Sequence, residues 1–385
     1  MTQVIFTERC DYMKVIAAID SFKGSMTSME AGNAVKKGIL AAKPDAEVWL
    51  SPLADGGEGT VDALIEGLGA KKIPVTVAGP LGEKVSCYYG FLEETKMAVM
   101  EMASAAGITL VTKKDPLRAS TYGVGEMIAD ALKRGCKNFM IGIGGSATND
   151  GGIGMLKALG FEFFDEDGND VGEGAAALAK IEVIRTENKN PLLSGAKFQI
   201  ACDVKNPLCG KQGATYIFGP QKGVTEEQKE QVDEAMRHYA DVTKESLDCD
   251  FADCEGAGAA GGLGYAFLSY LAGELIPGVE LILQATGLEE KMKNADVVVT
   301  GEGRLDAQTV MGKAPAGVAA LAKKYNAKVI AFAGSVAPEA KVCNRAGIDA
   351  FFPIVRGVTT LEEAMKKENA MENIAATAEQ VFRLL

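Results

Sequence analysis

Short apolar runs alternate with segments of helical periodicity at the start of the chain. Lys14–Ile19 and Val48–Leu53 are apolar runs of strand length. Between them, Thr27 and Glu30 have the spacing of a capping box, and apolar residues then recur at helical period. A second helix is expected from about Thr60. This strand–helix–strand–helix order is typical of a parallel sheet.

The C-terminal part of the chain repeats the same alternation. Strands are expected at Asp296–Thr300, Lys328–Gly334 and Ala350–Val355. A helix is expected after the first of them, and a last helix is expected after Thr360, packed through one apolar stripe that starts at Leu361. Because both ends of the chain share this pattern, we expect them to form one domain, with the middle of the chain inserted into it.

The middle of the chain has a less regular pattern. A helix near residues 121–134 leads into a strand at 138–143, and a long charged helix is expected at 225–247. The shorter spacing of a mixed or antiparallel sheet is found among the strands expected near Val75–Val77, Val85–Phe91 and Ala98–Met102. At 385 residues, the chain is long enough for about two domains.

Composition and charge narrow the class of protein. Apolar residues make up 47% of the chain and charged residues 24%, which is typical of a folded globular protein. The formal net charge of −12 argues against nucleic-acid binding, since an acidic chain repels phosphate backbones. No apolar run reaches the roughly 18–20 residues of a membrane span, and residues 1–12 lack a signal-peptide core. With eight scattered cysteines and no Cys-x-x-Cys, we expect a cytoplasmic protein with reduced thiols.

Glycine-rich polar loops follow the expected strands at four places. In open α/β sheets, ligands bind at the carboxyl ends of the strands, and glycine lets the backbone approach a ligand closely. A single glycine-rich loop can be an ordinary turn, but four that also carry charged residues predict a functional site. The four loops are Asp20–Ser25, Ala54–Thr60, Gly142–Gly152 and Thr300–Asp306.

Familiar nucleotide-binding motifs do not fit these loops. The segment from Gly142 to Ala147 matches Gly-x-Gly-x-x-Ala, but turn-rich residues 148–152 follow where a dinucleotide-binding fold needs an uninterrupted helix. No Gly-x-x-x-x-Gly-Lys-Ser/Thr sequence occurs, which excludes a P-loop nucleotidase. A further glycine run at 258–264 precedes an apolar helix and is as consistent with close packing as with phosphate binding.

The charged residues of these loops suit phosphoryl transfer. That reaction needs phosphate-binding N–H groups, a carboxylate-held Mg²⁺, a cation near the developing charge and a carboxylate that accepts the hydroxyl proton. Each carboxylate alone is more readily explained as a helix cap or turn residue, but as a group they suit Mg²⁺ bound together with substrate phosphates. The carboxylates of the loops are Asp20, Asp55, Glu58, Asp150, Glu302 and Asp306, joined by Asp203 in the segment that begins Cys202-Asp-Val-Lys-Asn-Pro, and the accompanying cations are Lys23, Lys205, Lys211 and Arg304.

At these loops the sequence resembles the class I glycerate kinases. The resemblance rests on the strings DSFKGS, ADGGEGT, GGSATNDGG, ACDVKNP, FGPQKG, GAAGGLG and TGEGRLDAQTVMGK, which occur in family order from about Met13 to the C-terminus. It implies ATP-dependent phosphorylation of D-glycerate, with 2-phosphoglycerate as the product. It also implies two α/β domains, one a discontinuous Rossmann- or flavodoxin-like parallel sheet and the other an inserted mixed α/β domain. We expect the discontinuous domain at 13–78 and 290–385, the inserted domain at 79–289 and an N-terminal extension at 1–12.

Roles for the loop residues follow from their chemistry. Asp203 follows an apolar strand and precedes Lys205, which would keep it ionised, so it is the expected base or the residue that orients the hydroxyl. Arg304 can hold a carboxylate through two parallel hydrogen bonds, with Lys23 as the competing anchor for that carboxylate or for a phosphate. We assign catalytic roles to Asp203, Lys23 and Arg304, and substrate binding to Asp20, Ser21, Lys23, Asp55 and Arg304. We assign nucleotide binding to Gly144, Gly145, Ser146, Asn149 and Asp150, and Mg²⁺ binding to Asp55 and Asp306.

The expected ligands are D-glycerate, ATP and Mg²⁺, bound in a cleft between the two domains, with neither nucleic acid nor a membrane as a partner. One alternative is a kinase for another small hydroxy acid or sugar acid. A second is a non-catalytic protein that binds small carboxylates. The surplus of loop carboxylates disfavours the second alternative, because they would repel a carboxylate ligand unless a metal intervened. The sequence leaves the oligomeric state open.

Overall fold

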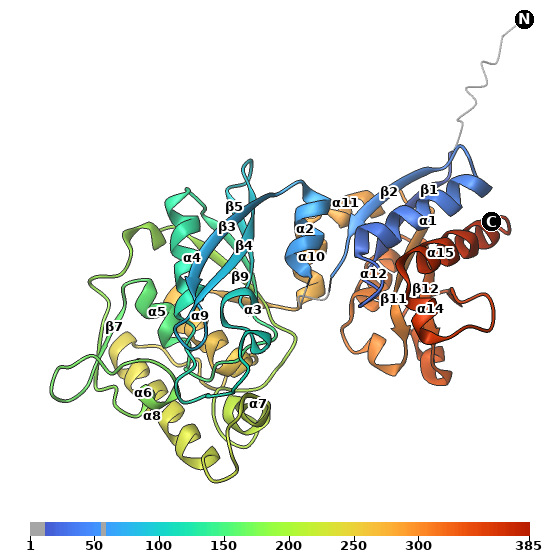
Figure 1. Ribbon diagram of the computed structural model, residues 1–385. Helices are drawn as coiled ribbons and strands as arrows, with labels where there is room; N and C mark the ends of the chain where they lie inside the picture. The colour runs from blue at the N-terminus through green and yellow to red at the C-terminus, as the bar shows by residue number, and fades with distance from the viewer. Residues whose placement is uncertain (1–11, 55–58) are drawn as a thin grey trace, which may run out of the picture. The chain divides into compact units, whose positions relative to one another are not determined.

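A fully parallel five-stranded sheet is the centre of the first unit of the computed structural model, which describes residues 12–54 and 59–385. This unit joins residues 12–53 to residues 283–385 (Figure 1). The strand order β13-β12-β11-β1-β2 is the flavodoxin-like order, in which the direction of winding reverses between β1 and β11. The strands are β1 (Lys14–Ile19), β2 (Glu47–Pro52), β11 (Val297–Leu305), β12 (Lys328–Val336) and β13 (Ala350–Pro353).

Helices bury both faces of this sheet. Helix α1 (Ser28–Ala42) begins at the expected capping box of Thr27 and Glu30 and packs against α15 (Lys367–Phe382). The two helices share a core with alternate residues of the strands, among them Val15, whereas Ile16 is buried on the opposite face. Helix α12 (Ala314–Lys324) packs on β11, β12 and β1. Shorter helices are η4 (Ala307–Val310), η5 (Pro338–Lys341), α11 (Leu288–Met292), α13 (Val342–Arg345) and α14 (Leu361–Met365).

The contact between α1 and α15 depends on Gly38, which yields a stability prediction. A Cβ on Gly38 would lie 2.0 Å from the carbonyl oxygen of Ala375, so Gly38→Ala must push the two helices apart. We expect the free energy of unfolding to fall by about 1–3 kcal/mol, the range of overpacking, although alanine is the better helix former. Denaturant unfolding measures the change. Gly357→Ala is the matched control, because a Cβ there meets nothing within 4 Å. Equal stability of the two variants would contradict this packing.

The second unit, residues 54–282, is built on a mixed six-stranded sheet of order β10-β9-β6-β5-β4-β3. Strands β5, β6, β9 and β10 are parallel, so their carboxyl ends lie at one edge. Strand β4 runs antiparallel to both of its neighbours, β3 and β5. The strands of the sheet are β3 (Lys71–Ala78), β4 (Lys84–Leu92), β5 (Met97–Glu101), β6 (Asn138–Gly142), β9 (Lys197–Ala201) and β10 (Glu274–Ile276). A separate antiparallel pair consists of β7 (Glu162–Phe164) and β8 (Val183–Arg185).

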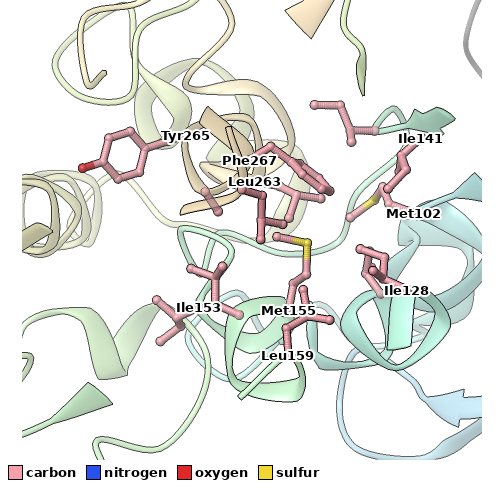
Figure 2. Packing of buried hydrophobic residues seen from close by; sticks show 14 of the residues in the cluster. Met102, Ile128, Ile141, Ile153, Met155, Leu159, Leu263, Tyr265 and Phe267 are labelled. Atoms are coloured by element: carbon pink, nitrogen blue, oxygen red, sulfur yellow. The ribbon is translucent and has the colours of Figure 1, made fainter. Parts of the chain in front are cut away.

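An apolar core supports the strand ends of the second unit. Figure 2 shows part of it, where Met155 of α5 lies near Leu263 and Phe267 of α9. The helices are α2 (Thr60–Leu68), α3 (Ala103–Ala106), α4 (Tyr122–Lys133), α5 (Ile153–Ala158), α6 (Ala175–Leu178), α7 (Ala214–Lys222), α8 (Lys229–Leu247) and α9 (Leu263–Leu271). The short turns are η1 (Ile108–Leu110), η2 (Pro191–Leu193) and η3 (Ala259–Gly261), and α10 (Gly278–Ala285) spans the division between the units.

The structure confirms the α/β fold with one discontinuous and one inserted domain, and its two units differ from the expected domain boundaries at residues 54–78 and 283–289. The first difference arises because β3 pairs with β4 along its whole length and so belongs to the second sheet. The expected N-terminal extension, 1–12, lies outside the described residues except for Tyr12. Within the described residues, no helix combines the length and the apolar character needed to cross a bilayer.

Two C-terminal elements differ from the sequence-based expectation. Strand β11 continues past Thr300 to Leu305, because β12 is equally long and pairs with it through Arg304 and Ser335. The expected single last helix is broken at Lys366, whose backbone is extended. Leu361 is accordingly exposed, whereas the apolar stripe of α15 is buried.

Candidate active site

In the first unit, the loop after β1 lies against the end of β11, at the point where the winding of the sheet reverses. The Asp20 amide donates to the carbonyl oxygen of Gly301 at 2.9 Å, and the Asp20 side chain is only 7% exposed. Its carboxylate accepts a hydrogen bond from the Ser21 amide at 2.7 Å. The chain then turns back through Lys23, which is exposed at the tip of the turn. Asp20, Ser21 and Lys23 therefore share one strand-end site.

Arg304 and Asp306 lie on the same edge of the first sheet. Arg304 is a residue of β11 itself and not of a loop, and its side chain is 66% exposed. Its Nε lies 3.5 Å from Oδ2 of Asp306. Asp306 caps η4, because its Oδ1 accepts a hydrogen bond from the Gln308 amide at 2.9 Å. Asp306 thus has a structural role, and one carboxylate oxygen directed toward the arginine. The neighbouring Glu302 is buried and accepts a hydrogen bond from the Thr309 hydroxyl at 2.6 Å.

In the second unit, a pocket of about 270 Å³ lies at the carboxyl ends of β6 and β9. Three of its lining residues, Gly144, Gly145 and Ser146, follow β6, and Asp203 follows β9. The structure therefore brings together the loop assigned to the nucleotide and the residue assigned as the base. The volume lies just below the usual range of about 300–1,000 Å³ for small-molecule sites, so it suits part of a nucleotide.

Asp203 is exposed on the rim of this pocket. Its Oδ1 accepts a hydrogen bond from the Gly278 amide at the start of α10, at 2.8 Å, which fixes the direction of the carboxylate. Lys205, expected beside it, instead forms an ion pair with Glu255 at 3.0 Å. The lysine that lines the same pocket as Asp203 is Lys222.

Asn149 and Asp150, both assigned to the nucleotide, are fully buried and do not line the pocket. The Asp150 carboxylate accepts hydrogen bonds from the amide and hydroxyl of Thr121 at 2.8 Å, and from the amides of Gly152 and Gly154. Burial raises the pKa of this carboxyl, and those hydrogen bonds oppose the rise. The side-chain amide of Asn149 donates through Nδ2 to the Thr215 hydroxyl at 3.0 Å. Both side chains therefore hold the loop in place from behind.

Lys222 is a site residue that the sequence analysis did not single out. It is the last residue of α7, is 2% exposed and lines the pocket. A sequence signal was present, because Lys222 belongs to FGPQKG, one of the strings that carry the family resemblance. Asp55, assigned to substrate and Mg²⁺, lies outside the described residues, as does Glu58.

Glycine-rich backbone, a buried lysine, an arginine and several carboxylates at the ends of parallel strands are the parts that phosphoryl transfer to a small molecule requires. The fold and these sites define a small-molecule kinase built from two α/β domains. The model of the glycerate kinase family matches residues 15–385, and the chain belongs to that family.

Known relatives resemble the chain over nearly its whole length. It is 44% identical to the glycerate kinase of Bacillus subtilis (strain 168) over 371 residues, which cover 96% of this chain and 97% of the relative. It is also 44% identical to the glycerate 2-kinase of Escherichia coli (strain K12), with 95% and 98% covered. A crystal structure from Salmonella typhimurium LT2 that bears the name glycerate kinase 2 matches with a TM-score of 0.89 at 42% identity, and covers 97% of this chain and 98% of that one.

The protein is therefore a kinase that transfers a phosphoryl group to an alcohol group. The alternative of a non-catalytic carboxylate-binding protein is wrong, because the family model and the Bacillus subtilis and Escherichia coli relatives are those of kinases.

Proposed function

We propose that the chain is an ATP-dependent D-glycerate 2-kinase that forms 2-phosphoglycerate. The observation that carries this proposal is the pocket of the second unit, where Asp203 shares a small cavity with Gly144–Ser146 and Lys222. A carboxylate suited to accept a hydroxyl proton and groups suited to hold phosphates thus lie together. The position of the phosphate on the product is supported by the name of the Escherichia coli relative, a glycerate 2-kinase.

Each substrate has a candidate set of binding residues. We assign the glycerate carboxylate to Arg304, with Asp20, Ser21 and Lys23 of the same unit beside it, because the guanidinium fork matches a carboxylate. We assign the phosphates of ATP to Gly144, Gly145 and Ser146. Asp203 is the proposed base. Asp55 stays a proposal for substrate or metal binding.

The described residues supply few side-chain ligands for Mg²⁺. Within residues 12–54 and 59–385, no group of three His, Cys, Asp or Glu side chains could hold a metal ion. Kinase Mg²⁺ sites need only one or two carboxylates, because substrate phosphates and water complete the coordination. We propose Asp306 and Asp55 as those carboxylates, with Asp203 as the alternative. When bound, the ion would neutralise phosphate charge.

Analysis of the product tests the proposed function. ATP and D-glycerate are incubated with the protein, and ³¹P NMR identifies the phosphorylated product. We expect ADP and 2-phosphoglycerate. Formation of 3-phosphoglycerate would contradict the position, and a lack of turnover with ATP would contradict the phosphoryl donor. A higher kcat/KM for another small hydroxy acid or sugar acid would favour the alternative substrate class.

Gly145→Val is expected to weaken the apparent affinity for ATP by roughly tenfold, about 1.4 kcal/mol. Gly145 lines the pocket and has a φ of 74°, a conformation that a β-branched residue adopts only with strain. The added side chain also occupies space that a ligand needs. Steady-state kinetics measure the change.

The control for this prediction is Gly168→Val. Gly168 has a similar φ of 80° with open space around it, and lies in the turn after β7, so it reproduces the strain without touching the pocket. Unchanged apparent affinities for both substrates in a folded Gly145→Val protein would remove this loop from the site.

We also propose a cytoplasmic location. The cysteines that the structure describes, which exclude Cys10, are all free thiols, as is usual in a reducing compartment.

A further inference from the structure

Lys222 is a buried cation whose hydrogen-bonding capacity is largely unused. Its ammonium donates to the carbonyl oxygen of Thr148 at 2.6 Å, and within the described residues this is its one hydrogen bond. An ammonium has three N–H donors. Buried charged groups are ordinarily paired or fully hydrogen-bonded, because removing them from water is unfavourable. The protein alone therefore leaves this charge incompletely satisfied.

Asp150, the carboxylate that acts electrostatically on Lys222, does not supply the missing hydrogen bonds. Asp150 acts on Lys222 electrostatically, but the Asp150 oxygens accept hydrogen bonds from Thr121, Gly152 and Gly154, and the two side chains form no direct ion pair. Burial lowers the pKa of Lys222 to about 7, and Asp150 opposes that shift. An anion placed beside Lys222 would stabilise its charged form.

The pocket beside Lys222 also shows a strained backbone. Ala260 lines it and has φ 52° and ψ 36°, the left-handed conformation that non-glycine residues rarely adopt. Strain of this kind persists where the surrounding structure enforces it, which is frequent at ligand sites. Gly144 and Gly145, on another wall, leave the backbone open to close approach.

We propose that Lys222 binds a phosphate group of the nucleotide in this pocket, together with the backbone of Gly144–Ser146. This inference rests on the proposed ATP-dependent kinase activity and adds a binding residue to it. Phosphate fits better than the glycerate carboxylate for two reasons. A lysine serves phosphate as a point charge, whereas a carboxylate is matched by the fork of an arginine, which Arg304 supplies in the first unit. The pocket of about 270 Å³ beside Lys222 also has room for a larger anion than a carboxylate.

The experiment compares binding of ADP, pyrophosphate and adenosine to the wild-type protein and to Lys222→Met by calorimetry. We expect Lys222→Met to weaken ADP and pyrophosphate at least tenfold and to leave adenosine within about twofold. A general disturbance of the pocket would weaken adenosine as well, so the contrast separates a phosphate contact from a structural role. Lys180→Met is the matched control, because Lys180 is exposed and does not line the pocket.

Each other outcome has a definite meaning. ADP binding within twofold of wild type in a folded Lys222→Met protein overturns the proposal. A tenfold rise in the KM for D-glycerate with unchanged ADP binding also overturns it, and assigns Lys222 to the carboxylate. A wild-type protein that binds pyrophosphate but does not use ATP contradicts the proposed phosphoryl donor and leaves the phosphate site supported. A wild-type protein that binds neither ADP nor pyrophosphate contradicts the site.

The wild-type protein supplies a measurement that does not depend on the folding of a variant. Because the pKa of Lys222 is about 7, its amine is largely neutral at pH 8, and an adjacent phosphate should draw a proton onto it. ADP binding at pH 8, measured in buffers of different ionisation enthalpy, should therefore take up a substantial fraction of a proton, with much less uptake at pH 6. Within the described residues, the other titratable groups around Lys222 are Asp203 and Cys202, which line the same pocket, and Asp150, which acts on it electrostatically. Net proton release on ADP binding at pH 8 would contradict the proposal.

Discussion

Arg304→Lys is expected to fold as the wild type does and to reduce kcat/KM for D-glycerate roughly 10- to 100-fold. The loss follows because an ammonium cannot reproduce the two parallel hydrogen bonds of a guanidinium, and a hydrogen bond to a charged group contributes about 1.5–3 kcal/mol. The fold should persist because the Arg304 side chain is mostly exposed. Its contact with Asp306 at 3.5 Å is a surface ion pair, which contributes little to the free energy of unfolding. We expect most of the effect in the KM for D-glycerate.

Arg383→Lys is the matched control for this prediction. Arg383 makes an exposed i,i+4 ion pair with Glu379 in α15 and has no place in the proposed site. Near-wild-type turnover of Arg304→Lys would remove Arg304 from the site. Lys23 would then be the carboxylate anchor, and Lys23→Met should show the rise in KM instead.

Asp203→Asn is expected to lower kcat about 10²- to 10⁴-fold, the usual contribution of a positioned base. Asparagine keeps the oxygen that accepts the hydrogen bond from the Gly278 amide, so the loop after β9 should keep its position. It cannot accept the proton of the glycerate hydroxyl, and that loss should appear in turnover. Asp167→Asn, in an exposed turn of the same unit, is the control.

The dependence of turnover on Mg²⁺ separates a base from a metal ligand. Removing the base should leave the Mg²⁺ concentration for half activity nearly unchanged, whereas removing a metal ligand should raise it. Turnover of Asp203→Asn within a few-fold of wild type would show that the base assignment is wrong. If the variant chiefly shifts the Mg²⁺ dependence, Asp203 belongs to the metal, and the base must be sought at Asp55, Asp20 or Asp306.

Local sequence predicted an element of the fold well where residues within that element set its first and last residues. Lys14–Ile19 is a strand with the predicted bounds, and the capping box at Thr27 and Glu30 begins α1. Both patterns depend on residues that are neighbours in the chain. Prediction failed where a partner decided the limits. Strand β11 extends to Leu305 because β12 offers hydrogen-bonding groups that far, and Leu361 is exposed because the last helix breaks at Lys366.

The candidate site shows the same division. Loops rich in glycine and charge identified the strand ends at which Asp20, Arg304 and Gly144–Ser146 lie, because the carboxyl ends of parallel strands are where an α/β sheet leaves space for ligands. Residues of one loop could not be told apart by sequence. Asp150 and Gly145 belong to the same glycine-rich segment, yet one is buried behind the loop and the other lines the pocket.

The sequence by itself determined that the chain is an α/β protein with strand-end loops suited to phosphoryl transfer, and its motifs identified the family. These properties are carried by short segments and by the order of elements. Only the tertiary structure decided which sheet β3 joins, which loop carboxylate is a helix cap, and that Lys222 lines the pocket with Asp203. The physical reason is that strand pairing, burial and the compensation of a buried charge depend on groups from distant parts of the chain, which meet only once the chain has folded.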